Sequence, residues 1–179
     1  MERYELKSQK SRFNRMCIAE AIIELMKTED LKKIRISAVV KKAGVSRTTF
    51  YKYYNTLEDV LDDYMNEIVA EYNVEKHKNS EITSLYDYKN ILLTFNFFDQ
   101  YADFFKIITN QGLYSILIDA INSFMTKNFY SEKYNLYELY CYSGGLLNIF
   151  IKWEEQGKKE KPEEIAQIVY DLYHHLHDK

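Results

Sequence analysis

Residues 34–61 read IRISAVVKKAGVSRTTFYKYYNTLEDVL, and this stretch decides the fold of the chain. Apolar residues at helical spacing on both sides of a glycine predict two short helices, Ile36–Ala43 and Arg47–Tyr54. Gly44 supplies the left-handed backbone that ends a helix, and Ser46 is a typical N-cap for the next one. The stretch therefore predicts a helix-turn-helix followed by the start of a longer helix.

The composition favours an all-helical chain. Of its 179 residues 46% are hydrophobic, and only five glycines and one proline are present to interrupt helices. Asn-Gly and Asp-Gly hairpin signals are absent, which argues against a sheet. We expect about nine helices, over residues 8–28, 36–43, 47–54, 57–76, 85–101, 103–110, 113–128, 136–156 and 162–177.

Two further features indicate where the protein works. No apolar run approaches the roughly 20 residues that span a bilayer, and the N-terminus lacks the apolar core of a signal peptide. Cys17 and Cys141 are far apart within helical patterns, as expected of reduced thiols. We therefore expect a cytoplasmic protein without membrane association.

Charge is divided unevenly along the chain. Residues 1–56 carry 13 Lys/Arg and 6 Asp/Glu, whereas residues 57–179 carry 11 and 21. No acidic residue lies between Asp30 and Glu58, a stretch that contains seven basic ones: Lys32, Lys33, Arg35, Lys41, Lys42, Arg47 and Lys52. One interpretation is a solvated basic face; the other, favoured by the helix-turn-helix in the same stretch, is a surface for double-stranded DNA.

A helix-turn-helix can read DNA because its second helix enters the major groove while the first braces across the backbone. Arginine pairs bidentately with guanine, and threonine can donate, accept or touch a thymine methyl. A helix N-terminus and its serine cap suit phosphate oxygens. Residues 46–53 offer all of these groups.

The same residues carry a resemblance to a known family. Ala43-Gly44-Val45-Ser46, Tyr51, Tyr54 and the acidic, leucine-bearing Glu58–Leu61 resemble the DNA-binding domain of the TetR/AcrR family of bacterial transcription regulators. The resemblance implies a three-helix head, a long connecting helix, and a variable helical body that binds ligand and dimerises. We place the DNA-binding domain at residues 1–56, with the connecting helix continuing to about residue 70, and the regulatory domain at residues 57–179.

The resemblance assigns DNA contacts to residues at matching positions: Ser46, Arg47, Thr48, Thr49, Tyr51, Lys52 and Tyr53. The chain departs from the family pattern at two places. Arg35 stands where a capping threonine is usual, and we expect it to contact phosphate directly. Leu57 stands where a lysine is usual, so only its backbone amide is expected to contact DNA.

The body is dense with aromatic residues at helical spacing. Such residues usually form a core, and the alternative is that some line a cavity for a small apolar or aromatic effector. The candidate pocket residues are Phe95, Phe98, Tyr101, Phe105, Leu117, Ile121 and Tyr142.

The last two predicted helices indicate a dimer. Gly144-Gly145, the Trp153 region and Pro162-Glu-Glu-Ile-Ala resemble a TetR subgroup described as dihydroxyacetone-kinase regulator-like, which implies a two-fold dimer through a four-helix bundle. The candidate interface residues are Leu146, Phe150, Trp153, Ile165, Ile168, Val169, Leu172, Tyr173 and Leu176.

These observations predict a homodimeric repressor that binds a palindromic operator and responds to an effector at its body. An alternative is a DNA-binding coregulator whose body docks a partner protein. An enzyme is disfavoured because no phosphate-binding glycine loop, nucleophile elbow or Cys-His arrangement is present. His174 and His177 alone make a poor metal site, so neither a metal nor a cofactor is expected.

Overall fold

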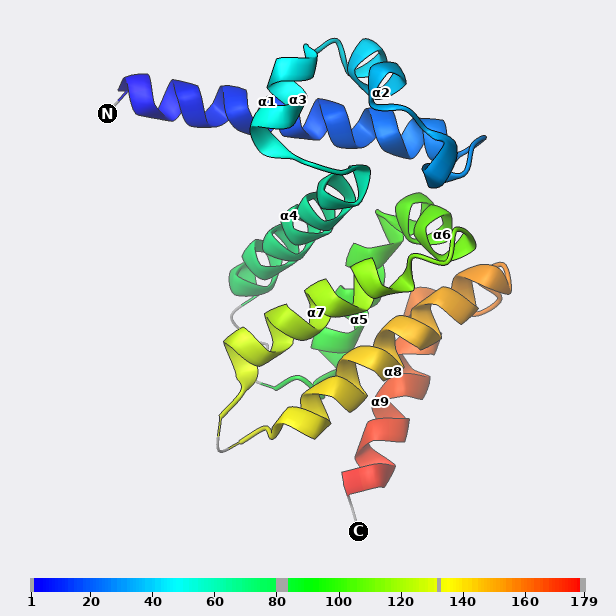
Figure 1. The fold of residues 1–179 in the computed structure, drawn as a ribbon. Coiled ribbons are helices and arrows are strands. Elements are labelled where there is room, and N and C mark those ends of the chain that lie inside the picture. Colours follow the sequence, from blue (N-terminus) through cyan, green and yellow to red (C-terminus); the bar gives the residue numbers. More distant parts are fainter. Residues whose placement is uncertain (1, 80–83, 132, 178–179) are drawn as a thin grey trace. The chain divides into compact units, whose positions relative to one another are not determined.

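A computed structural model describes residues 2–79, 84–131 and 133–177, with side chains placed in 9–79, 84–131 and 133–175. Across these ranges the chain is helical, with nine α-helices, one 3-10 turn at Leu31–Lys33 and no strand (Figure 1). The predicted all-α class is confirmed.

The helix bounds follow the predictions closely. They are α1 Glu2–Met26, α2 Ile36–Ala43, α3 Arg47–Tyr53, α4 Leu57–Lys78, α5 Tyr88–Asp99, α6 Ala102–Asn110, α7 Tyr114–Phe129, α8 Leu136–Glu155 and α9 Pro162–His177. The first helix begins earlier than expected. The loop predicted over residues 77–84 falls partly on residues 80–83, which lie outside the described ranges.

The chain forms two compact units. One, here called the head, contains the residues up to Glu67 together with Ile107–Ile116. The other, here called the body, contains Ile68–Lys106 and Leu117–Lys179. Helices α4, α6 and α7 each contribute residues to both units.

The head is built on apolar faces that the sequence pattern predicts. Ile18 and Ile22 of α1, Val39 of α2 and Phe50 of α3 are fully buried. Gly44 has φ 66°, a left-handed conformation that only glycine adopts without strain, and it ends α2. Because α3 then starts directly from this turn, its N-terminus is held beside α2.

Gln111 fastens a late segment of the chain onto the head. Its side-chain amide donates to the carbonyls of Met26 at 3.0 Å and Glu29 at 2.9 Å, and its Oε1 accepts from the Leu31 N–H at 2.7 Å. These backbone groups lie at and just after the end of α1, where carbonyl groups have no hydrogen-bond donor within the helix. The segment 107–116 thus belongs to the head, although it begins 40 residues after Glu67, the last residue of the head's first piece.

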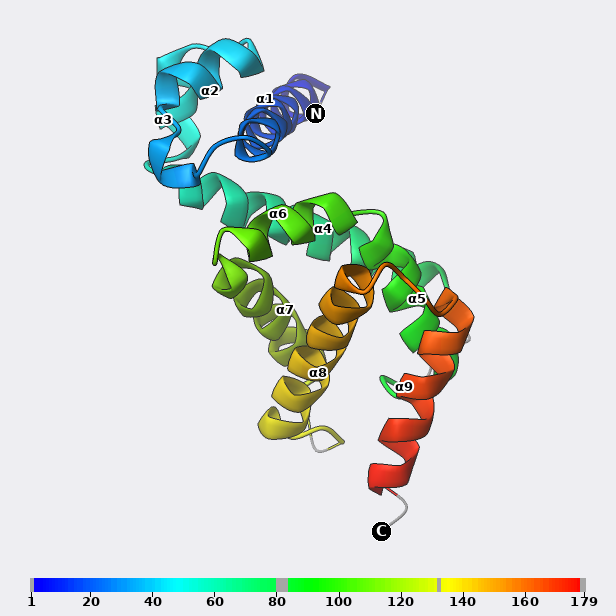
Figure 2. The same ribbon diagram turned by 90° about the vertical axis from the view of Figure 1, so that its right-hand side faces the viewer.

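Helices α5 and α9 lie side by side in the body (Figures 1 and 2). Aromatic rings from α5, α6 and α8 fill its core, with ring centroids 5–6 Å apart: Phe95, Phe98, Phe105, Phe150 and Trp153. At Gly145 an added Cβ would lie 3.0 Å from the Tyr173 hydroxyl. The absence of a side chain at this position therefore allows α9 of the same chain to approach α8 closely.

Candidate DNA-binding surface and ligand pocket

The acid-free stretch of the head presents its positive charge to solvent. All seven of its basic side chains are exposed: Lys32, Lys33, Arg35, Lys41, Lys42, Arg47 and Lys52. They come from the 3-10 turn, α2 and α3 and from the turns between them. No acidic residue lies within the stretch itself, and the nearest ones in sequence are Asp30 and Glu58 at its two ends.

The N-terminus of α3 is capped as predicted. The Ser46 hydroxyl accepts from the Thr49 N–H at 3.0 Å and lies 2.8 Å from the Thr49 hydroxyl. Arg47 and Thr48, the next two residues, are exposed, and so is Tyr51. Phe50 is buried in the core of the head, so one face of α3 is packed against the head and the opposite face is exposed to solvent.

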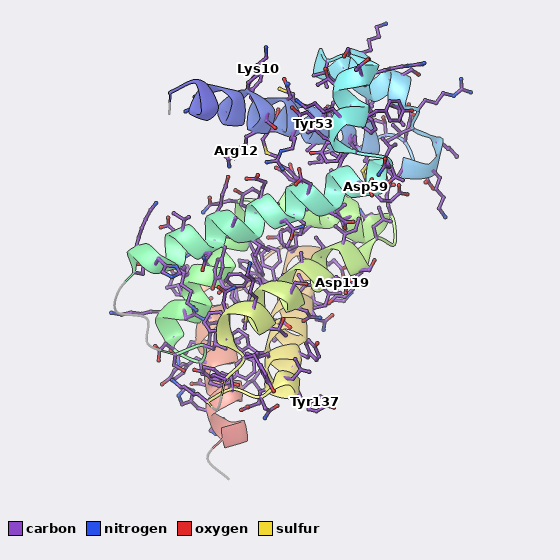
Figure 3. All side chains as sticks on the ribbon, turned by 60° about the vertical axis from the view of Figure 1, so that its left-hand side comes forward. Lys10, Arg12, Tyr53, Asp59, Asp119 and Tyr137 are labelled. Carbon is purple, nitrogen blue, oxygen red and sulfur yellow. The ribbon has the colours of Figure 1, made fainter. Side chains whose placement is uncertain are left out.

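Tyr53 differs from the other residues of α3 because it faces α1. Hydrogen bonding from Ser11 lowers the pKa of Tyr53, and Asn14 contributes a second hydrogen bond. The Lys52 ammonium lies 5.2 Å from the Tyr53 ring. Figure 3 shows Tyr53 between α3 and α1. Its hydroxyl thus ties α3 to α1, and its predicted contact with DNA stays a prediction.

The two departures from the family pattern have visible consequences. Arg35 occupies the N-cap position of α2 without a side-chain cap hydrogen bond, and its side chain is exposed. Leu57 is buried at the first position of α4. The turn before it is closed by Asp59, whose carboxylate accepts from the Asn55 and Thr56 N–H groups at 2.8 and 3.0 Å, and these bonds lower the pKa of Asp59.

Two arginines of α1 face α4 and form ion pairs. Arg15 donates to both oxygens of Asp63 at 2.6 and 2.7 Å and to Glu67 at 2.9 Å, and Arg12 donates to Glu67 at 3.0 Å. The Tyr54 hydroxyl donates to the same Asp63 at 2.6 Å. Figure 3 shows Arg12 pointing towards α4 and Lys10 pointing away from it. Arg12 and Arg15 therefore stabilise the head.

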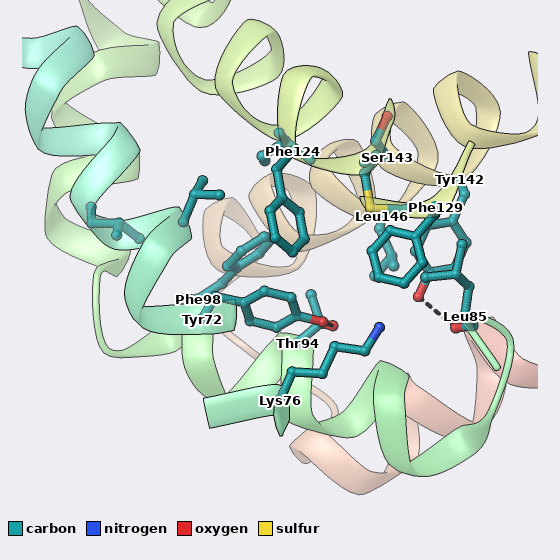
Figure 4. A pocket seen from close by; sticks show the side chains of 14 residues that line it. Tyr72, Lys76, Leu85, Thr94, Phe98, Phe124, Phe129, Tyr142, Ser143 and Leu146 are labelled. Carbon is teal, nitrogen blue, oxygen red and sulfur yellow. Dashed lines mark hydrogen bonds between the residues drawn. The ribbon is translucent and has the colours of Figure 1, made fainter. Parts of the chain in front are cut away.

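The body encloses a small, mostly apolar pocket of about 40 Å³ (Figure 4). It lies among α4, α5, α7 and α8. Its lining is Ile68, Val69, Tyr72, Lys76, Leu85, Thr94, Phe98, Ile121, Phe124, Met125, Phe129, Tyr142, Ser143 and Leu146.

Some of the predicted pocket residues line this cavity and others do not. Phe98, Ile121 and Tyr142 line it. Phe95, Phe105 and Leu117 are buried in the core of the body away from the lining. The Tyr101 hydroxyl is a donor to Glu71 at 2.5 Å.

Eleven of the 14 lining residues were not predicted as pocket residues, and Lys76 is the one among them with a charged side chain. It continues the apolar stripe of α4 at four-residue spacing after Ile68 and Tyr72, and a charge on such a stripe is the signal that could have revealed it. Its ammonium lies 4.2 Å from the centre of the Phe129 ring. Burial lowers the pKa of Lys76 to about 8, although Asp87 acts to raise it.

The hydroxyls of the pocket are engaged with the protein. The Tyr142 hydroxyl donates to the Leu85 carbonyl at 2.8 Å and accepts from the Asn90 amide at 3.0 Å. The Tyr72 hydroxyl lies 2.9 Å from that of Thr94. Burial raises the pKa of Tyr72 to about 12 and also raises the pKa of Tyr142, so both phenols are neutral at ordinary pH.

The candidate dimer residues divide into two groups. Six lie in the core of the chain itself: Leu146, Phe150, Trp153, Ile165, Val169 and Tyr173. Ile168 and Leu172 are 48% and 51% exposed on α9, and the Leu176 side chain lies outside the described residues. The six have little surface for a partner because α8 and α9 bury them against their own chain. On α8, Tyr137 and Tyr140 are exposed, and Figure 3 shows Tyr137 at the start of that helix.

Two other kinds of site were sought. In the described part of the chain, no three His, Cys, Asp or Glu side chains gather as a metal would require. His174 stacks on Tyr170 with ring centres 3.9 Å apart. None of the helices described is long and apolar enough to cross a membrane.

Sequence comparison finds regulators. Residues 88–175 match the family model TetR_C_8, transcriptional regulator C-terminal region. The chain is 25% identical over 171 residues to YxbF of Bacillus subtilis (strain 168), named as an uncharacterized HTH-type transcriptional regulator. The match covers 87% of this chain and 43% of that protein, so the chain spans less than half the length of that relative.

Solved structures share the fold. A TetR-family regulator structure from Syntrophomonas wolfei has a TM-score of 0.67 at 16% identity, covering 91% of this chain and 94% of that one. FadR from Bacillus subtilis, in complex with stearoyl-CoA, has a TM-score of 0.58 at 17% identity, and the match covers 88% of this chain and 96% of that one. The dihydroxyacetone kinase operon activator DhaS has a TM-score of 0.57 at 17% identity, and the match covers 89% of this chain and 93% of that one. At these identities the likeness is one of fold.

Proposed function

Because this chain is a transcriptional regulator of the TetR type, we propose that it binds double-stranded DNA through its head and that its body controls this binding. The family is one of regulators rather than of enzymes. The observation that carries the proposal is the exposed positive charge around a capped α3, over a stretch without an acidic residue. Phosphate contacts from this charge supply affinity, and base contacts supply sequence choice.

The residues of α3 divide between these two tasks. Arg47 and Thr48 are exposed in its first turn, where side chains of a recognition helix reach base edges. Ser46 and the adjoining helix N-terminus suit a phosphate oxygen. Lys52, Tyr51, Thr49 and Tyr53 complete the proposed contacts from α3, and Arg35 adds a phosphate contact from the start of α2.

The test of DNA binding is selection of duplexes from a random library by the purified chain at low salt, followed by affinity measurement. We expect a palindrome to be enriched, and Arg47→Ala to weaken its binding by about 1–3 kcal/mol if the arginine reads guanine. Lys127→Ala, an exposed lysine of α7, is the matched control and should leave affinity unchanged. Failure to enrich any duplex would refute the proposal.

We further propose a homodimer, which places two heads on half-sites about one helical turn, or a multiple of it, apart. The surface proposed for pairing is the exposed apolar part of α9, Ile168 and Leu172, together with Tyr140 of α8. Leu172→Glu should convert the dimer to monomers in analytical ultracentrifugation, because it places charge in an apolar contact. Gln167→Glu, an exposed change on the same helix, should not.

Regulation is proposed to be repression relieved by an effector. A dimer seated on an operator blocks access to that DNA, and a ligand can release it only through different affinities for the bound and free states. The pocket of the body is the proposed effector site. The second candidate, a body that docks a partner protein, is supported by the exposed Tyr137 and Tyr140 and would be favoured by a specific protein that co-purifies while no metabolite binds.

A further inference from the structure

We propose that the pocket of the body binds a small monocarboxylate, with its carboxylate paired to the Lys76 ammonium and its short apolar part among the aromatic rings. The inference rests on the proposed effector control and names the chemical class of the effector. It is carried by the position of one charged side chain in a lining that is otherwise uncharged.

Lys76 is the only one of the 14 lining residues with a charged side chain at neutral pH. Figure 4 shows its side chain reaching along the pocket, with the amine between Tyr72 and the rings of Phe129 and Tyr142. Among the side chains that the structure describes, no carboxylate lies within 4.0 Å of the amine. Asp87 acts on this ammonium electrostatically, but among the described side chains the desolvated amine has a ring face and no carboxylate at ion-pair distance, so it can gain a charge-assisted hydrogen bond from an incoming anion.

The other polar groups of the lining are poorly placed to compete for the ligand. The Tyr142 hydroxyl is held by Leu85 and Asn90, and the Thr94 hydroxyl donates to the Asn90 carbonyl at 2.8 Å. The Ser143 hydroxyl donates to the Asn122 amide oxygen at 2.5 Å. Lys76 therefore offers the donors that remain for recognition, and an ammonium selects an acceptor with negative charge.

The size of the pocket limits the ligand. A cavity needs about 10–15 Å³ to hold one water molecule, so the 40 Å³ of this pocket hold roughly three water-sized groups. The walls beside the amine are apolar, with Leu85, Phe124 and Phe129 among them. A carboxylate with a chain of one or two carbons matches this space, whereas a ring needs a larger cavity and a second charge on the ligand would have no partner there.

The test is calorimetric binding of formate, acetate and propionate to the full chain, each beside its uncharged amide. We expect at least one carboxylate to bind about tenfold or more tightly than its amide, the difference that one charge-assisted hydrogen bond supplies. Lys76→Met should abolish this preference, and Lys76→Arg should retain part of it. Lys78→Met, an exposed lysine of the same helix paired with Glu75 at 3.2 Å, should preserve it in full.

The pH profile adds a second readout. Lys76 loses its charge near pH 8, so carboxylate affinity should fall as pH rises through that value, while amide affinity should not. The other titratable groups near the amine are Tyr72, Tyr142 and Asp87, and the two phenols stay neutral over this range.

Three outcomes would overturn the proposal: no carboxylate of the panel binds, carboxylates and amides bind equally, or the preference survives Lys76→Met. Because calorimetry is done without DNA, these outcomes leave the proposed operator binding standing. Conversely, loss of duplex selection with intact carboxylate binding would refute the DNA proposal alone.

Discussion

In the head, Arg15 of α1 lies against Asp63 and Glu67, whereas in the body Lys76 of α4 reaches an apolar pocket without a carboxylate at ion-pair distance in the described residues. Burial alone would lower the pKa of Arg15, but Asp63, Tyr54 and Glu67 together outweigh it and the pKa is raised. Burial lowers the pKa of Lys76, and nothing outweighs it. The two cations therefore differ both in depth of burial and in partners, since Lys76 is the more deeply buried and has no carboxylate at ion-pair distance among the described residues.

This difference distinguishes a structural cation from one available for binding. The Arg15 guanidinium donates its hydrogen bonds to Asp63 and Glu67 of α4 and so holds α1 against the first part of that helix. Burial of the Lys76 ammonium carries a desolvation cost that pairing with an anionic ligand would offset. Changing each residue should therefore move stability in opposite directions.

Arg15→Met should have the largest effect. It leaves the part-buried carboxylate of Asp63 without its ion pair, and we expect the free energy of unfolding to fall by about 1–2 kcal/mol, less than for a fully buried pair because water still reaches the site. Urea denaturation measures the change. Arg12→Met is the control: its side chain is 53% exposed against 25% for Arg15, and it should cost about 0.5 kcal/mol or less. Equal losses for the two variants would contradict this account.

Lys76→Met should act in the other direction and more weakly. The pKa of Lys76 is about 8 in the folded chain against an ordinary 10.5, so the charged form destabilises the fold fully below pH 8 and progressively less up to pH 10.5. We expect the variant to melt about 2 °C higher than the parent at pH 7, with a smaller difference at pH 9.5. Scanning calorimetry at both values measures this. A variant that is less stable at pH 7 would show that the lysine is satisfied within the fold.

Lys52→Ala should have the smallest effect and tests the exposed charge of the head. If Lys52 contacts a phosphate, its removal should lower the slope of log affinity against log salt by about 1 per head and weaken all duplexes alike. Stability should hardly change, since the side chain is exposed. Titrations of the selected palindrome and of a scrambled duplex at several salt concentrations provide the measurement. A loss confined to the palindrome would instead place Lys52 on a base.

Local signals predicted the head well. The spacing of Val39 and Phe50, the glycine at 44 and the serine cap at 46 all act within one or two helical turns, and the structure places each as expected. The hydrogen bond between Tyr53 and α1 could not be foreseen in this way, because its partner Ser11 is 42 residues away.

The body shows the limits of the same reasoning. Helical spacing identified Phe98, Ile121 and Tyr142 as inward-facing but could not tell a pocket wall from solid core, since both present apolar side chains at the same period. Likewise, helical spacing on α9 could not tell which residues of its apolar stripe cover helices of the same chain. Val169 and Tyr173 are buried within their own chain, where α5 and α8 supply the covering surface, whereas Ile168 and Leu172 are exposed.

The three hydrogen bonds of the Gln111 side chain to the end of α1 affect how the head could be transferred to another protein. A chimeric protein that exchanged only the residues up to Glu67 would leave this glutamine behind, and the carbonyls of Met26 and Glu29 would lose their donor. The residue at this position would then come from the other protein, and nothing would ensure that it bonds to the backbone at the end of α1. A portable version of this head therefore consists of two pieces of sequence, and the shorter one, Ile107–Ile116, must travel with the longer.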